Sequence, residues 1–558
     1  MVLAAAGLGL RLGDHPLIDP DEGRNALVAL EMAVSGDYVV PHLNGLPHLD
    51  KPVLFYAAGA LATRLFGPSE LAVRLPALAS TWATVALVAW FSVHLFGRRT
   101  AWVAGTACAT APLAIAMART VIFDSMLSFF IVLALIAFYR AVEAPMETPD
   151  GSSPWRARGW VLLAWAAMAF GMLTKGPVAL AVPLLVAAPY AIWRRRPAVV
   201  WHPLGALLFL LLVLPWAWAV ETRVPGFLRY ALVTETWRRL TTGELQRGGP
   251  IWYFLPYLIG GCFPWVLLVA AAGRERWREM RTEERRPLVF LALWTAVPLL
   301  FFSLSQSKRP QYILPLVAAF ALWTAWVWSG GRAPARGLRA AAAGWVLLSG
   351  VLLWAAQSHR LLAAEPEIAN SAAPTAFILG ALMLVSGVLA WAGSRRPGLS
   401  LAALSLPLVL LPVVTAPLMI DLARARSGKD LAAGLRPHLT PETTIVGIAT
   451  FLPSLAFYLG RPIHLSDATG EPLRSNYILR DAETWMAADS TLHPPSWWQE
   501  ALISCSRPVI FLLKRRYRTE RSMLEAADLP LLLEDPSFLV MGPCRPPTTP
   551  GATGNGEG

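Results

Sequence analysis

The stretch from Asp21 to Lys51 holds a dense group of side chains whose types could support acid–base or phosphate chemistry. It places carboxylates, histidines and cations close together in a chain that is 55% hydrophobic. A carboxylate can act as a general base, and a lysine ammonium can bind a phosphate as a point charge. We therefore expect a functional loop, containing Asp21, Glu22, Arg24, Glu31, Asp37, His42, His48, Asp50 and Lys51.

A short helix and a compact loop must position these residues. Pro20 precedes the acidic pair Asp21–Glu22 and helix-forming residues follow, so we expect a helix to begin at that pair. Asp21 has a second interpretation as a cap of this helix, because Asp is favoured there. Breakers then fold the chain into a loop that ends at Lys51; they are Gly36, Pro41, Asn44, Gly45 and Pro47.

Three motifs of this loop resemble those of the polyprenyl-phosphate-dependent glycosyltransferases, the ArnT-like and protein O-mannosyltransferase-related family. The sequence reads D-E-G-R-N from residue 21, G-D-Y-V-V-P-H-L-N-G from residue 36 and D-K-P-V-L-F-Y from residue 50. ArnT-like members carry D-E-x-R-Y, G-D-W-x-x-P-x-x-N-G and E-K-P-P-L-x-Y-W. The chain departs from them at Asn25, Tyr38 and Asp50. The resemblance implies the GT-C fold and an inverting sugar transfer.

The resemblance also implies catalytic carboxylates at Asp21, Glu22 and Asp124. Asp21 would be the general base if the acceptor is a hydroxyl. Asp124, which follows Arg119 in a short loop, would orient the acceptor or help to bind a metal.

Cations and one tyrosine of other family segments would contact the donor phosphate. They are Lys51, Arg24, Lys175, Arg239, Lys308 and Tyr312. Lys51 is the main candidate, and the alternative is a lysine that snorkels at the membrane edge. Lys175 in T-K-G-P could equally be a residue of the membrane interface. A tyrosine at a membrane boundary is ordinary, but the motif S-K-R-P-Q-Y-I-L-P favours a functional role for Tyr312.

Arg239 belongs to the segment E-T-W-R-R-L. Thr236 stands there in place of the family histidine, and Arg238 is a rival for Arg239. A divalent metal cation is a further expectation, with Asp50 and His48 as ligands, although no H-x-x-x-H or H-E-x-x-H spacing supports it. No other cofactor is expected.

The composition independently predicts a polytopic membrane protein. The 558 residues have a mean hydropathy of +0.49 and only 15% charged residues. Thirteen apolar runs occur, most of them long enough to cross a bilayer. They lie at about 2–12, 71–95, 101–117, 122–141, 159–173, 177–193, 198–219, 252–272, 287–303, 311–328, 340–356, 373–392 and 399–420. The first is too short to span, so either the start is truncated or Met1 lies inside the first helix.

Arginines in alternate loops predict the orientation. Because cytoplasmic loops are rich in Arg and Lys, the Arg-rich loops should face the cytoplasm, and the first loop and the tail should face outward. The excess positive charge, +12 overall, lies in these Arg-rich loops and is explained by the topology, so we expect no nucleic-acid partner.

The tail changes character at about Asp421. Residues 443–450 and 507–513 are predicted to be buried strands, and 454–459 and 519–527 helices. We therefore expect a transmembrane catalytic domain over 1–420 with a first loop at 13–70, a periplasmic α/β domain over 421–545, and a disordered end at 546–558. Cys505 and Cys544 would then lie in an oxidising compartment and could form a disulfide.

These observations predict a GT-C glycosyltransferase with about 13 transmembrane helices in a bacterial inner membrane. By resemblance, it would take 4-amino-4-deoxy-L-arabinose or another pentose or hexose from undecaprenyl phosphate. The acceptor would be lipid A, another glycan or a protein. The alternatives are a transporter of lipid-linked sugar or polysaccharide, in which the charges should lie within the spans, and a polysaccharide polymerase or ligase.

Overall fold

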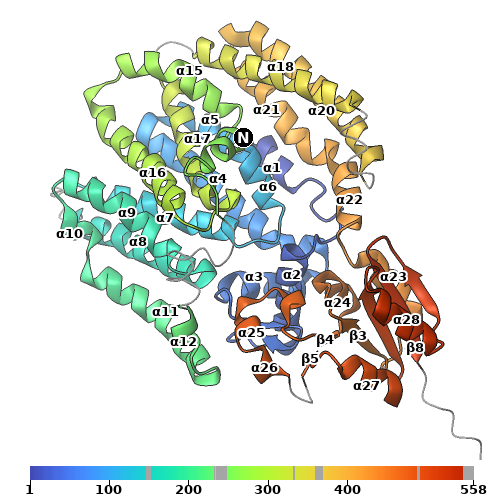
Figure 1. Ribbon diagram of the computed structural model, residues 1–558. Helices are drawn as coiled ribbons and strands as arrows, with labels where there is room; N and C mark the ends of the chain where they lie inside the picture. The colour runs from blue at the N-terminus through green and yellow to red at the C-terminus, as the bar shows by residue number, and fades with distance from the viewer. Residues whose placement is uncertain are drawn as a thin grey trace, which may run out of the picture. The chain divides into compact units, whose positions relative to one another are not determined.

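The computed structural model describes residues 1–145, 153–231, 233, 248–330, 334–358, 368–486 and 490–544 (Figure 1). The chain forms two compact units. The first contains Met1–His15 and Lys51–Leu422, and the second contains Pro16–Asp50 and the residues from Ala423 onward. The expected disordered end at 546–558 lies outside the described residues.

The first unit is helical throughout its described residues. Its longer helices are α3 (Leu54–Phe66), α4 (Glu70–Phe96), α7 (Asp124–Val142), α8 (Ser153–Lys175), α9 (Val178–Trp193), α11 (Pro203–Arg223), α15 (Trp265–Arg278), α16 (Arg285–Leu304), α17 (Leu314–Trp328), α18 (Ala335–Gln357), α20 (Ala369–Ala392) and α21 (Pro397–Val414). Shorter ones are α1 (Val2–Gly9), α5 (Ala101–Ala109), α6 (Pro112–Ala118), α14 (Phe254–Gly261) and η4 (Pro310–Ile313), and α22 (Ala416–Arg424) runs into the second unit.

Within the described residues, nine helices are long and apolar enough to cross a membrane, or eleven segments if two bent helix pairs each count once. This count over the described residues is lower than the expected number of about 13. Of the two other predicted runs, 177–193 forms the 16-residue helix α9 and 2–12 forms the eight-residue helix α1. Neither reaches the length of about 20 residues that a spanning helix needs.

The runs 101–117 and 252–272 are not single straight helices. The angle between α5 and α6 is 63°, and the angle between α14 and α15 is 92°. Pro112 and Pro264 lie at these two breaks, and a proline has no N–H to continue the hydrogen bonding of the preceding helix. The side chains pack where the chain bends, because Trp265 Nε1 donates a hydrogen bond to Thr110 Oγ1 at 3.1 Å.

The second unit contains a six-stranded sheet in the order β5-β4-β3-β6-β8-β7. The first four strands in this order, β5 (Leu492–His493), β4 (His464–Ser466), β3 (Thr444–Ile448) and β6 (Val509–Lys514), are parallel; β8 (Phe538–Cys544) and β7 (Leu531–Glu534) continue the sheet antiparallel. The predicted strands at 443–450 and 507–513 are thus confirmed as β3 and β6. The helices α24 (Pro453–Leu459) and α28 (Arg518–Ala526) confirm the two predicted helical stretches.

Residues 16–50 also belong to this second unit, whereas we expected the whole first loop, 13–70, to belong to the membrane domain. The helix α2 (Asp21–Ser35) begins at the acidic pair, as predicted. A hairpin of β1 (His42–Leu43) and β2 (Leu46–Pro47) follows, and its two turn residues, Asn44 and Gly45, both have positive φ. Asn and Gly are favoured in such a tight turn because they tolerate this backbone conformation.

Hydrogen bonds explain why the loop joins the tail. The Asn44 side chain donates to the carbonyl of Ile463 at 2.7 Å and accepts the N–H of the same residue at 2.9 Å. The Asn44 side chain therefore pairs with the backbone of a residue more than 400 positions away, a contact that no local sequence pattern predicts.

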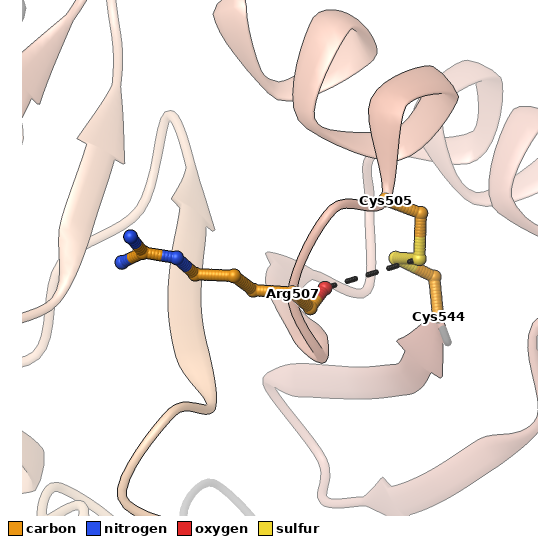
Figure 2. Close-up of a disulfide and its surroundings, with 3 residues drawn as sticks. All are labelled: Cys505, Arg507 and Cys544. Carbon is orange, nitrogen blue, oxygen red and sulfur yellow. Dashed lines mark hydrogen bonds between the residues drawn. A yellow bond between two sulfur atoms is a disulfide. The ribbon is translucent and has the colours of Figure 1, made fainter. Parts of the chain in front are cut away.

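The predicted disulfide between Cys505 and Cys544 is confirmed (Figure 2). Cys505 follows α27 (Trp497–Ser504), and Cys544 is the last residue of β8. The bond therefore links the end of a helix to the antiparallel part of the sheet.

Candidate functional site

Three predicted site residues meet in the first unit, and we call them the Lys175 cluster: Asp124, Lys175 and Tyr312. Lys175 Nζ lies 2.5 Å from Asp124 Oδ1 and 4.9 Å from the centre of the Tyr312 ring. The three residues come from α7, the end of α8 and η4. The structure therefore brings together side chains that the sequence indicated one by one.

Helix ends position the two charges of the Lys175 cluster. Asp124 is the first residue of α7 and Lys175 is the last residue of α8. Gly176 follows with φ 99°, a value that a residue with a side chain rarely adopts, and Pro177 comes next, so α8 must end there. A carboxylate at a helix N-terminus and an ammonium at a C-terminus both interact favourably with the helix dipole.

The ion pair is well shielded from solvent. The Asp124 side chain is 3% exposed and the Lys175 side chain is 14% exposed. The Lys175 ammonium also faces an aromatic ring, which adds a cation–π attraction. The arrangement holds one cation at a fixed place, where it could neutralise an anionic group while Asp124 accepts a hydrogen bond from a substrate hydroxyl.

Lys308 lies in the segment that precedes Tyr312. Its side chain is buried, and its Nζ donates to the carbonyl of Ser305 at 2.7 Å. A Cβ on Gly249 would lie 3.4 Å from the Lys308 side chain and 2.9 Å from Tyr253. The segment that contains Gly249 therefore packs against Lys308.

Tyr253 is a residue that the sequence did not indicate. Its ring centre lies 5.0 Å from that of Tyr257. An aromatic run beside a membrane helix has no distinguishing pattern, so only the fold could find it.

No described contact joins two of the predicted phosphate-binding residues, Lys51 and Arg239, to the Lys175 cluster. Lys51 is the first residue of the long segment of the first unit, and its neighbour Asp50 belongs to the second. Arg239 lies outside the described residues, as do its rival Arg238 and Thr236. The roles of Lys51 and Arg239 remain predictions.

In the second unit, Asp21 and Arg24 form an ion pair one helical turn apart, with 2.6 Å between Oδ1 and Nη2. Arg24 Nη1 also donates to the carbonyl of Arg474 at 2.9 Å. Asp21 makes no side-chain cap of α2, because no cap hydrogen bond is present and Pro20 occupies the capping position. The Asp21 side chain is 42% exposed, so its carboxylate is accessible.

Glu22 is buried beside it, and Glu22 Oε2 accepts the N–H of Ile18 at 3.1 Å. This contact closes the turn that leads into α2. The catalytic role of Glu22 remains a prediction.

Two more carboxyls near this helix have perturbed pKa values. Burial raises the pKa of Asp19 to about 7, against two hydrogen bonds from Ser454 that lower it. Burial likewise raises the pKa of Glu31 to about 7, although Glu31 accepts the N–H groups of Asn44 and Gly45. Asp19 was not indicated by the sequence, since its partner Ser454 lies in the tail.

Asp50 and His48, the expected metal ligands, have partners within the second unit. Asp50 accepts the N–H groups of Asn476 and Tyr477 at 3.0 and 2.8 Å, so it holds the start of α25 (Asn476–Arg480). His48 Nδ1 lies 2.9 Å from Ser475 Oγ. Across the described ranges, no group of three or more His, Cys, Asp or Glu residues could hold a metal ion. The metal-binding role of Asp50 and His48 remains a prediction.

Comparison with known protein families gives one match in the N-terminal half. The family of dolichyl-phosphate-mannose-protein mannosyltransferases matches residues 26–231. This range contains Lys51 and the Asp124–Lys175 pair, but neither Asp21 nor Tyr312.

Curated relatives match a similar share of the chain. The undecaprenyl phosphate-alpha-4-amino-4-deoxy-L-arabinose arabinosyl transferase of Aeromonas salmonicida is 35% identical over 317 residues, which are 56% of each chain. The protein of the same name from Pseudomonas aeruginosa strain UCBPP-PA14 is 36% identical over 327 residues, 58% of each chain. The match therefore spans little more than half the length of these relatives.

Similarity of structure extends over nearly the whole chain. The crystal structure of ArnT from Cupriavidus metallidurans bound to undecaprenyl phosphate has a TM-score of 0.79 at 25% sequence identity, covering 97% of this chain and 96% of that one. The apo structure of the same protein has a TM-score of 0.81 at 24% identity over the same shares. Both the helical unit and the α/β unit thus have counterparts in one solved fold.

Proposed function

We propose that this chain, an ArnT-like multi-pass membrane protein with the GT-C fold, is a glycosyltransferase. It would transfer a sugar from a polyprenyl-phosphate carrier to an acceptor. The donor would be an undecaprenyl-phosphate-linked sugar, because a solved structure of the same fold is bound to undecaprenyl phosphate. The sugar would be 4-amino-4-deoxy-L-arabinose, which the curated relatives carry in their names. Lipid A is the acceptor that we would test first, with another glycan or a protein as the alternatives.

The Lys175 cluster is the observation that carries the proposal. A shielded ammonium held by Asp124 and faced by Tyr312 supplies a fixed positive charge. Such a preorganised charge stabilises a developing anion far better than a solvated one, because it needs no reorganisation when the reaction occurs. A departing lipid phosphate is an anion of this kind.

The reaction would be a direct displacement at the anomeric carbon. The acceptor hydroxyl loses its proton to Asp21 while its oxygen attacks the anomeric carbon from the face opposite the phosphate. The bond between that carbon and the phosphate oxygen breaks, and its electron pair leaves with the polyprenyl phosphate. The products are the glycosylated acceptor and free polyprenyl phosphate, so atoms and charge balance without a metal.

The other predicted residues would support this step. Lys51, Arg239, Lys308 and Arg24 are the cations available for binding the donor phosphate. Arg24 would also position the Asp21 carboxylate, since the two are paired at 2.6 Å. By the distribution of arginines, the reaction would occur on the periplasmic side of the bacterial inner membrane.

The test uses the purified full chain with an undecaprenyl-phosphate aminoarabinose donor and lipid A. Mass spectrometry follows free undecaprenyl phosphate and glycosylated acceptor. We expect Lys175→Met and Lys51→Ala to lose transfer by about 10²- to 10³-fold, the effect of removing one stabilising group. Asp21→Asn keeps the shape of the side chain, so it should lose about 10²- to 10⁴-fold in kcat with little change in the KM for the donor.

Lys514→Ala is the matched control, because it removes a lysine at the end of β6 that we assign no role. Its transfer rate should equal that of the unaltered chain. Equal release by all four variants would refute the site assignment. A chain that moves the lipid-linked sugar across vesicles without ever releasing undecaprenyl phosphate would instead be a transporter.

A further inference from the structure

A groove in the first unit lies apart from the Lys175 cluster, between α15, α16 and α17. We call it the α15–α17 groove. Its volume is about 550 Å³, within the range of about 300–1,000 Å³ that is usual for small-molecule sites. Small residues, among them Gly273, Ala292 and Ala296, leave the space, and the indoles of Trp277, Trp323 and Trp326 line it.

The lining requires an apolar occupant. One pair of polar groups in the lining is satisfied internally, since Trp323 Nε1 donates to Thr295 Oγ1 at 3.1 Å. All three helices belong to segments that are apolar enough to cross a membrane, so we expect lipid chains to surround the groove. An extended hydrocarbon chain fits a groove of this chemistry.

One cation lines the groove as well. Arg274 is exposed, and it forms no ion pair within the part of the chain that the structure describes. Its neighbours are engaged: Arg276 is buried against Glu284 and the carbonyl of Trp326, and Glu275 pairs with Arg336. The charge of Arg274 is therefore available to a ligand.

We propose that the α15–α17 groove binds an anionic phospholipid, with one acyl chain between the three helices and the phosphate at Arg274. Arg274 begins an Arg-rich segment that extends to Arg286 and marks a membrane boundary, where anionic headgroups gather. The site is separate from the sugar donor site and supplies nothing to the transfer reaction.

The experiment uses the full chain reconstituted with phosphatidylglycerol or phosphatidylcholine of identical acyl chains, and native mass spectrometry counts the retained lipids. Phosphatidylglycerol should be retained preferentially. Arg274→Gln should reduce its retention about fivefold, the effect of one basic side chain near a membrane surface, and leave phosphatidylcholine unchanged. A phosphatidylglycerol with a diazirine in its acyl chain should label peptides of α15–α17.

Arg278→Gln is the matched control, because it removes an exposed arginine one turn further along α15 that does not line the groove. It should retain phosphatidylglycerol as the unaltered chain does. Ala296→Trp fills the groove and should abolish the labelling. If Ala296→Trp prevents folding, Arg274→Gln still tests the proposal. Equal retention of the two lipids, or equal losses in both arginine variants, would overturn the proposal. Displacement of the label by undecaprenyl phosphate would also overturn it, because the groove would then belong to the donor chain.

Discussion

Asp124 and Lys175 stabilise one another, and each would destabilise the fold alone. Both are shielded, with side chains 3% and 14% exposed. Taking a charge out of water is expensive unless a partner offsets the loss, so removing one member of such a pair costs more than replacing both with neutral groups. Comparing the stability of single and double variants therefore distinguishes the contribution of the pair to folding from the contribution of Lys175 to the reaction.

A double-mutant cycle tests this separation. Lys175→Met should lower the free energy of unfolding by about 3–5 kcal/mol, because it leaves the Asp124 carboxylate buried without its cation. Asp124→Asn combined with Lys175→Met should recover most of that loss and still lack transfer activity. Melting curves in detergent measure the first quantity and the release of undecaprenyl phosphate measures the second. Tyr312→Phe serves as the control for folding, and a double variant no more stable than Lys175→Met would show that the pair is not coupled.

The sequence predicted these residues but not how they meet. T-K-G-P and the loop after Arg119 each indicated a single charge, and pairing across about 50 residues has no local signature. Asp50 likewise has partners that only the fold reveals. It accepts two N–H groups of α25, which no local pattern around His48 predicts.

At the scale of elements, hydropathy located the helices and missed their bends. Apolar composition is a property of each segment, so runs such as 122–141 and 373–392 correspond to α7 and α20. The bends at Pro112 and Pro264 depend on how neighbouring helices accommodate free backbone groups. Another proline, Pro298, lies inside α16 and leaves that helix continuous. Prolines alone therefore did not predict which runs would break.

The disulfide between α27 and β8 makes its own prediction. Closing a segment of 39 residues should stabilise the second unit by about 4 kcal/mol in the chain-entropy model, so Cys505→Ser with Cys544→Ser should lower its unfolding free energy by about that amount. Cys108 and Cys262 are free, so alkylation of denatured, unreduced protein should label two thiols and not four. Four labelled thiols would show that the bridge does not form in the cell.

At the scale of the whole molecule, the second unit is assembled from two distant parts of the chain. Pro16–Asp50 and the residues from Ala423 onward share one set of hydrogen bonds, including those of Asn44 with Ile463 and of Asp19 with Ser454. The change in composition near residue 421 predicted where the tail begins. Its partnership with the first loop depends on single side chains more than 400 residues apart, so composition and periodicity could not predict it.

Asn44 tests this partnership. Asn44→Gly keeps the positive φ and removes both side-chain hydrogen bonds, so hydrogen exchange should accelerate at residues 42–47 and also at 463–466. The expected loss is about 1–3 kcal/mol, as for buried groups that lose their partners. Asn44→Ala should lose more, because alanine also strains the backbone at φ 55°. Exchange that accelerates only in the hairpin would contradict the shared unit.

Because the second unit is built from two distant segments of the chain, its parts are synthesised at different times. Residues 16–50 leave the ribosome early, whereas their hydrogen-bonding partners follow only after residues 51–422 have been made. At about 5–20 residues per second, that interval lasts roughly 20 to 75 seconds. During this time the loop has no partner for Asn44 and no Ser454 for Asp19, so the second unit cannot be completed until the tail has been made.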